Sequence, residues 1–167
     1  MATACKATNA EHAVVRVYDT EHYKLFGNPL QGHDLTVTRI CFSPDDRYIL
    51  TVSRDRSWRL FVLEGGSKYS GSEYRAIFLI TNSTAFKPIA AEKAHGRIIW
   101  DCAWSAEGDI FATASRDKSV KIWAQKNEQW TAVAVIQATY PVTAVAFCPA
   151  NGQGRLVFPA NLFFLMI

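Results

Sequence analysis

Two segments of the chain repeat one pattern of polar residues at a constant spacing of 62 positions, without a gap. The first copy consists of His33, Ser43, Thr51, Ser53, Arg54, Asp55 and Ser57, and the second of His95, Ser105, Thr113, Ser115, Arg116, Asp117 and Ser119. Self-similarity at a fixed period is typical of repeat architectures, in which each copy is one supersecondary unit. The fold is therefore predicted from the repeat rather than from the chain as a whole.

The spacing of aromatic residues indicates the length of one unit. Tyr18 and Phe61 lie 43 positions apart, and so do Trp104 and Phe147. The larger step of 62 is then one such unit plus an insertion. A period near 43 with four short strands is the length expected of a propeller blade. The sequence predicts an all-β, incomplete β-propeller with two full four-stranded blades and a partial blade at each end.

The polar pattern itself resembles the WD-repeat family: each copy has a His, a turn Asp 22 positions later, and an aromatic residue six positions after the Asp. This resemblance implies a hydrogen-bonded relay that staples each blade internally. The second repeat supplies all four members, which are His95, Thr113, Asp117 and Trp123. The first repeat supplies His33, Thr51 and Asp55, with Phe61 in place of the Trp.

Elementary chemistry accounts for the relay. A turn carboxylate accepts backbone N–H groups, and a buried one needs further donors such as an imidazole N–H. The other imidazole nitrogen then accepts a hydroxyl hydrogen, and that hydroxyl oxygen accepts the indole N–H. Phe61 has no donor, so the first repeat lacks the last link, at a cost of about 0.5–1.5 kcal/mol. Both histidines are interpreted as structural, because a catalytic His needs a cleft.

Strand patterns divide the chain into four segments. Residues 1–29 form a partial blade, 30–93 a WD blade with an inserted loop at 64–73 and an extended outer region, 94–137 a second WD blade, and 138–167 a truncated blade with a divergent apolar tail. The expected strands are Val14–Tyr18, Tyr23–Phe26, Val37–Phe42, Tyr48–Ser53, Ser57–Leu63, Tyr74–Thr81, Ile98–Trp104, Ile110–Ser115, Ser119–Ala124, Trp130–Ile136 and Val142–Phe147.

The last repeat pattern stops after Pro149, where the chain runs through glycines into the apolar segment Asn161–Ile167. That segment is too short for a spanning helix, which needs roughly 20 apolar residues. We interpret it as a terminus that departs from a parent sequence, through truncation or altered splicing. Two full and two partial blades do not close a ring, so exposed apolar strand edges and marginal stability in isolation are expected.

Composition excludes little. A net charge of +3 permits an anionic partner without requiring one. The four cysteines (Cys5, Cys41, Cys102 and Cys148) have no metal-ligand spacing, and we interpret them as reduced core thiols of an intracellular protein. The first 20 residues have no signal-peptide pattern. No phosphate loop, metal set or nucleophile–base pair is visible, so no catalytic residue, cofactor or metal is predicted.

Two longer stretches narrow the resemblance. Cys41–Trp58 and His95–Trp123, with its His-Gly-Arg-Ile-Ile-Trp opening, resemble the family of second subunits of the Elongator complex, in its C-terminal propeller. The resemblance runs from Val14 to Pro149. It implies a non-catalytic scaffold, cytoplasmic and nuclear, that holds catalytic and scaffold subunits of a complex modifying wobble uridines of transfer RNA. The alternative is an interaction module of another WD-repeat complex.

Four cations flank the two turn aspartates: Arg54, Arg56, Arg116 and Lys118. Equivalent turns of successive blades lie on one rim of a propeller, so these cations are expected to form an arc on a single face. Such an arc suits an RNA backbone or an acidic protein surface. The alternative is that these side chains are simply solvated or paired locally. Direct contact with RNA therefore stands beside the scaffold hypothesis, and an enzyme is the least favoured class.

Overall fold

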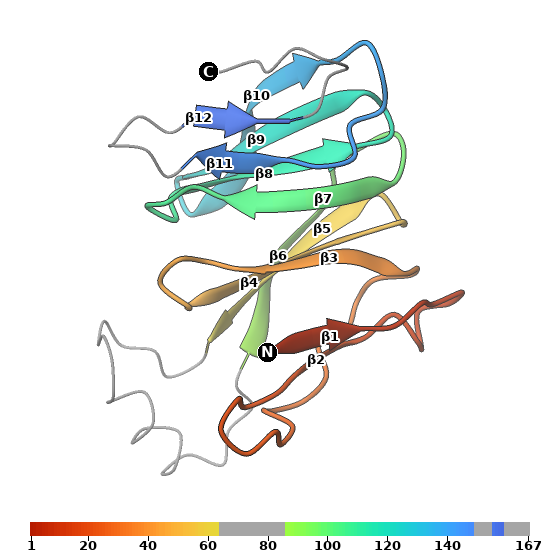
Figure 1. Cartoon of the computed structure of the whole chain (residues 1–167), viewed down its shortest axis with the longest axis vertical. Helices are drawn as coiled ribbons and strands as arrows, with labels where there is room; N and C mark the ends of the chain where they lie inside the picture. Colours follow the sequence, from red (N-terminus) through yellow and green to blue (C-terminus); the bar gives the residue numbers. More distant parts are fainter. Residues whose placement is uncertain (64–85, 149–154, 159–167) are drawn as a thin grey trace.

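The computed structural model describes residues 1–63, 86–148 and 155–158 of the 167-residue chain. Within these ranges the regular structure is β-strand, in four antiparallel sheets that follow one another along the chain (Figure 1). The described residues contain no helix long and apolar enough to cross a membrane. The prediction of an all-β, partial propeller is confirmed.

The two central sheets have four strands each, hydrogen-bonded in sequence order. The register repeats between them: Thr51 faces Arg59 across one central strand pair, and Thr113 faces Lys121 across the other. The sheets are therefore copies of one structural unit. The first consists of β3 (Val37–Phe42), β4 (Tyr48–Ser53), β5 (Ser57–Leu63) and β6 (Phe86–Lys93), and the second of β7 (Ile99–Trp104), β8 (Ile110–Ser115), β9 (Ser119–Lys126) and β10 (Gln129–Gln137).

A two-stranded sheet stands at each end of this pair. The first joins β1 (Ala2–Ala4) to β2 (Val15–Val17), and the second joins β11 (Ala146–Cys148) to β12 (Arg155–Val157). The outer strand expected at 23–26 is reduced to single bridges, which link Leu25 to Tyr18 and Leu30 to Val15. The strand expected at 142–147 starts only at Ala146, because the partner strand β12 has three residues to pair with it.

The outer strand of the first central sheet is not where the sequence predicts it. The expected strand Tyr74–Thr81 lies outside the described residues, as does the inserted loop at 64–73. The free edge of β5 is instead paired by β6, from Leu63 opposite Phe86 to Ser57 opposite Lys93. Outer strand β6 contains Pro88 and three charged residues, which is why its sequence does not show an apolar strand pattern.

Both outer strands carry a β-bulge at the equivalent place. In β6 the extra residue is Ile89, between the partners of Leu60 and Phe61, and in β10 it is Val133. Both bulged side chains are largely exposed, at 46% and 55%. The bulged residues lie 44 positions apart, but they face Leu60–Phe61 and Ile122–Trp123, which are equivalent positions of the 62-residue pattern.

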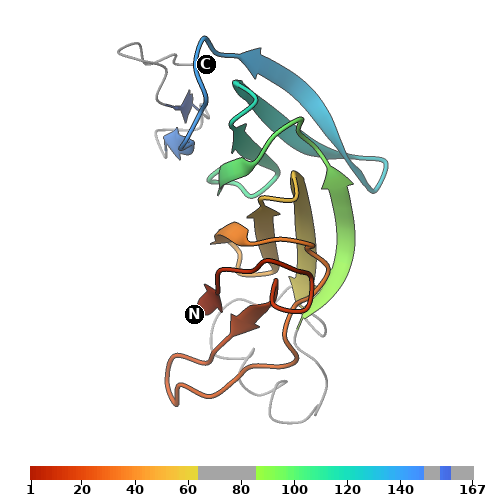
Figure 2. The same cartoon turned by 90° about the vertical axis from the view of Figure 1, so that its right-hand side faces the viewer.

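The core lies between the sheets rather than within one of them. The interface between the central sheets is built from Leu50, Val52 and Trp58 on one side and Phe111 and Trp123 on the other. Smaller apolar clusters join each central sheet to its two-stranded neighbour. Because β4 and β8 face a neighbouring sheet on both sides, five of six residues in each are buried. Figure 2 shows the resulting arc, with β6 and β10 along its convex side.

The cysteines only partly match the prediction of core thiols. Cys102 is buried, Cys41 and Cys148 are partly buried, and Cys5 is exposed, so the prediction is wrong for Cys5. None of the four forms a disulfide in this structure.

Candidate functional site

The polar residues of the second repeat form a continuous chain of hydrogen bonds inside the sheet. Trp123 Nε1 donates to Thr113 Oγ1 at 3.0 Å, and that oxygen lies 2.8 Å from His95 Nε2. His95 Nδ1 lies 2.9 Å from Asp117 Oδ2. Only one direction of donation satisfies every member: indole to hydroxyl, hydroxyl to Nε2, and Nδ1–H to the carboxylate. These four residues are the second relay, and its imidazole carries its proton on Nδ1.

The first relay repeats this geometry without the last link. His33 Nδ1 lies 2.8 Å from Asp55 Oδ2, and His33 Nε2 lies 2.9 Å from Thr51 Oγ1. Phe61 is buried at the position of the Trp but has no polar atom, and the Thr51 hydroxyl instead approaches the Arg59 carbonyl at 3.4 Å. The first relay therefore ends at Thr51.

Two serines that the sequence analysis left out of the relays complete the carboxylate sites. The hydroxyls of Ser57 and Ser119 each donate to Oδ1 of their Asp at 2.6 Å, and both also lie 3.1 Å from a His Nδ1. The sequence already pointed to these two serines, because both belong to the pattern that repeats after 62 residues. Their contribution shows that the repeated polar set, and not four residues alone, holds the turn.

Backbone donors complete the turn. Asp117 accepts the N–H groups of Gly96 and Ser119, at 2.9 and 3.0 Å. The residue after the Asp is left-handed in both repeats, with φ of 74° at Arg56 and 70° at Lys118. Such a conformation is uncommon outside glycine and favours Asn among the other residues. In each turn, the cation that follows the Asp therefore occupies a strained backbone position.

The surroundings keep both carboxylates ionised. Burial alone raises the pKa of Asp117, but hydrogen bonds from Ser119, Gly96 and His95 outweigh it, and the pKa lies below the ordinary value. The pKa of Asp55 is lowered against the same opposing burial by His33 and Ser57. Burial lowers the pKa of His95 more than Asp117 raises it, so this imidazole is neutral at neutral pH.

These shifts predict that the protein loses stability on acidification in two steps. A His with a lowered folded pKa stabilises the fold fully above its ordinary pKa of 6.5, and the contribution shrinks as the pH falls below that value. The carboxylates of Asp55 and Asp117 add a second loss below 3.8. Thermal unfolding followed across this pH range measures both. His95→Gln should flatten the first step, whereas replacement of the exposed His12 by Gln should not; an unchanged first step in His95→Gln would contradict the assignment.

The missing link predicts a stabilising substitution. Phe61→Trp supplies an indole N–H to Thr51, worth about 0.5–1.5 kcal/mol. An open groove of about 390 Å³, lined in part by Leu30, Phe61 and Phe86, lies beside this ring. Urea denaturation of Phe61→Trp with and without Thr51→Val measures the coupling. A gain that survives in the Thr51→Val background would contradict a hydrogen bond to this hydroxyl.

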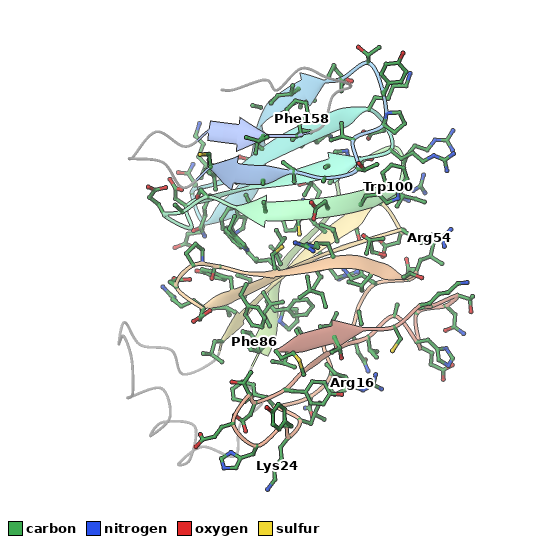
Figure 3. The ribbon with its side chains drawn as sticks, in the orientation of Figure 1. Arg16, Lys24, Arg54, Phe86, Trp100 and Phe158 are labelled. Carbon is green, nitrogen blue, oxygen red and sulfur yellow. The ribbon has the colours of Figure 1, made fainter. Side chains whose placement is uncertain are left out.

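The four turn cations lie along one edge of the two central sheets. Each turn joins the second and third strands of its sheet, β4 to β5 and β8 to β9, and both turns lie at the right-hand edge in Figure 1. Figure 3 shows Arg54 directed away from the ribbon at this edge. We call Arg54, Arg56, Arg116 and Lys118 the basic edge. All four are exposed, and within the described residues none has an acidic partner within ion-pair distance.

Other side chains lie at or away from the edge of the sheets that carries these four cations. Lys93 lies near this edge, because its strand partner is Ser57 and the N–H of Ala94 donates to the Arg56 carbonyl at 3.0 Å. Lys87 pairs opposite Val62 and lies at the far end of β6, away from this edge. Trp100, which the sequence analysis did not single out, lies partly exposed at the same edge as Arg54 (Figure 3).

One group of side chains has the donor types of a metal site. Asp19, Glu21 and His22 bring one ligand atom each within 4.8 Å of one another, among the residues that the structure describes. Asp19 already accepts the N–H groups of Glu21 and His22, at 2.9 and 2.8 Å. These bonds explain the cluster as a capped turn on the surface.

Comparison with known proteins agrees with this geometry. The family model described as "WD domain, G-beta repeat" matches residues 25–61 and 86–124. The two matches cover both relays. They stop short of the two-stranded sheet at the C-terminal end of the described chain.

Curated relatives extend the similarity to most of the chain. Elongator complex protein 2 of Schizosaccharomyces pombe is 44% identical over 151 residues, which is 89% of this chain and 18% of the relative. The proteins of the same name from Rattus norvegicus and Saccharomyces cerevisiae are 35% and 38% identical, covering 97% of this chain and 20% and 19% of the relatives. The chain thus spans about a fifth of the length of these relatives. It carries WD repeats in a partial β-propeller and resembles a segment of Elongator complex protein 2.

Proposed function

We propose that the chain acts as a non-catalytic interaction segment within an Elongator complex. The observation that carries this proposal is the similarity to Elongator complex protein 2 over 89–97% of the chain in three organisms. The scaffold would hold catalytic and further scaffold subunits, and the transfer RNA wobble-uridine chemistry would belong to the catalytic subunit. We propose cytoplasmic and nuclear localisation on the same basis.

The relay geometry supports a structural rather than a catalytic role. Both nitrogens of His33 and both nitrogens of His95 are occupied by protein partners within 3.1 Å. The side chains of His33 and His95 are 3% and 0% exposed, so neither reaches a substrate. A general base needs a free nitrogen within hydrogen-bond distance of its target. The surface left for function is the outside of the turns and strands.

The test is reconstitution with purified subunits. The full chain, tagged, is mixed with the remaining Elongator subunits and separated by size-exclusion chromatography. Co-elution in fixed stoichiometry supports the proposal. A chain that stays folded, as shown by a cooperative melting transition, yet elutes apart from every subunit contradicts it. Association instead with the subunits of a different WD-repeat assembly would favour the alternative of an interaction module outside Elongator.

A second candidate function is direct RNA contact through the basic edge. Exposed cations without acidic partners attract a phosphate backbone, and a partly exposed aromatic ring such as Trp100 offers a surface on which bases stack. Asp34 and Glu92 lie beside the first turn and reduce the positive charge locally. The two turns together still carry four exposed cations against two partly buried carboxylates.

This candidate predicts salt-sensitive binding. Reversing two charges, with Arg54→Glu and Arg116→Glu, should weaken single-stranded RNA binding at least about tenfold and flatten the dependence of log affinity on log salt by roughly 1.4. Lys126→Glu is the control for a single charge reversal, because Lys126 is exposed at the opposite end of β9. Fluorescence anisotropy over a salt series measures both quantities. Equal effects of the control and the double variant would reject the basic edge as the RNA site.

A further inference from the structure

Two thiols from different sheets meet where the inner strands of the central sheets lie side by side. The sulfur of Cys41 on β3 lies 3.6 Å from the sulfur of Cys102 on β7. Figure 1 shows these strands as neighbours at the junction of the two sheets. The two cysteines are 61 positions apart, so they are not equivalent residues of the repeat. Their contact arises from the packing of the sheets.

The two thiols differ in exposure and in hydrogen bonding. Cys102 is 1% exposed, whereas Cys41 is partly exposed. The S–H of Cys102 points at the sulfur of Cys41, and the S–H of Cys41 donates to the Cys102 carbonyl at 3.0 Å. A reagent in solution therefore reaches Cys41 first, and the buried thiol is already directed at the sulfur that would react.

Charged groups next to the thiols also favour Cys41 as the thiol that reacts first. Arg39 Nε lies 3.1 Å from Asp101 Oδ1, and both residues flank the cysteines on their own strands. The hydrogen bond from Cys102 lowers the pKa of Cys41, with a further contribution from Arg39, against burial and the Asp101 charge. Burial raises the pKa of Cys102. A more acidic, accessible thiol beside a less acidic, buried one is the arrangement of an attacking and a resolving cysteine.

We propose that Cys41 and Cys102 are a modification site at which a hydroperoxide forms a disulfide between two neighbouring sheets. The Cys41 thiolate attacks the terminal oxygen of the hydroperoxide and the O–O bond breaks. The attacked oxygen stays on the sulfur as a sulfenic acid, and the other oxygen leaves as an alkoxide or hydroxide that takes up a proton to become an alcohol or water. The sulfenic acid on Cys41 is then attacked by the Cys102 sulfur, which forms the S–S bond and releases water. Each hydroperoxide accepts two electrons from the two thiols.

The geometry requires only a local movement. The sulfurs must approach from 3.6 Å to the disulfide length of about 2.05 Å, a movement of about 1.5 Å. The bond would link two strands that are held by side-chain contacts, such as the 2.6 Å hydrogen bond that Thr38 Oγ1 donates to the Ile99 carbonyl. Oxidation would therefore fix the two repeat sheets against each other. The inference does not depend on the Elongator proposal.

The experiment is a titration of the reduced full chain with hydrogen peroxide. After quenching by alkylation and proteolysis, mass spectrometry should find a peptide pair joined through Cys41 and Cys102, lighter by two hydrogen atoms and separated again by dithiothreitol. The exposed Cys5 is the internal control and should remain largely alkylated at the same dose. Disulfides through Cys5, or oxidation of Cys41 to sulfinic acid without a bond to Cys102, would overturn the proposal.

Two variants test the roles of the partners. Cys102→Ala should leave a sulfenic acid on Cys41 that a 1,3-diketone traps, and Arg39→Gln should slow the reaction of Cys41 about threefold. Repeating the oxidation in urea should remove the advantage of Cys41 over Cys5. Equal rates for these two cysteines in the folded chain, or an unchanged rate in Arg39→Gln, would count against the assigned roles.

Discussion

Replacing Asp117 with Ala should lower the free energy of unfolding by about 3 kcal/mol. Its carboxylate accepts hydrogen bonds from His95, from the Ser119 hydroxyl and backbone, and from the Gly96 N–H. Removing it leaves those donors without a partner in a turn where the His side chain is fully buried. The magnitude stays near the lower end for a buried charge, because the Asp117 side chain is 20% exposed.

Urea denaturation of the full chain measures this loss. The control is Glu107→Ala, which removes an exposed carboxylate from the same sheet and should change stability by less than about 0.5 kcal/mol. Asp117→Asn should lie between the two, because it keeps an acceptor but loses the charge. If Asp117→Ala costs no more than the control, the relay does not staple the blade.

Trp58→Ala should cost about 3–5 kcal/mol, the range for removing a buried aromatic side chain. Trp58 is 1% exposed and packs edge-on against Phe111 and Trp123, with ring centroids 5.2 Å away in each case. It therefore fills the interface between the two central sheets. Loss of this ring should weaken the contact between repeats rather than the hydrogen bonds within one of them.

A pair of conservative variants separates ring packing from hydrogen bonding. The Trp58 indole nitrogen is buried without a partner among the described residues, whereas that of Trp123 donates to Thr113. Trp58→Phe should therefore be the milder change, and Trp123→Phe should lose about 0.5–1.5 kcal/mol more. Chemical denaturation of both variants tests the difference, and the reverse order of stability would contradict it.

The strands and the polar relay of each repeat could be predicted from the sequence, because the repeat period and the spacing of the polar residues determine them. The bounds expected for the three strands at 37–63 coincide with β3, β4 and β5. The turn residues around each Asp predict a hairpin at that position. The constant spacing of 22 positions between His and Asp then predicts that the imidazole lies beside the carboxylate in both repeats. The structure has hydrogen bonds between every predicted pair in the second relay.

Contacts between the repeats, and strands outside the repeated pattern, could not be predicted in this way. The outer strand β6 is recognised only by its pairing, because Pro88 and its charges obscure the alternation, while the apolar run at 74–81 looked like the better strand. The contact of Cys41 with Cys102 depends on how two sheets pack, and their spacing of 61 gives no repeat signal. The place of Trp100 beside the basic edge depends on the bulge in β7, where the residues before and after it pair with Ser115 and Ala114.

The bulges at Ile89 and Val133 affect how the outer strands β6 and β10 could pair with a strand of another chain. A second chain that adds itself to a sheet needs a straight, regular row of amides and carbonyls to continue the ladder. An inserted residue interrupts that row and increases the local twist, so an incoming strand meets a mismatch midway along both β6 and β10. The bulge that the two repeats share is therefore expected to oppose the addition of a strand from another chain at the outer edges of both central sheets.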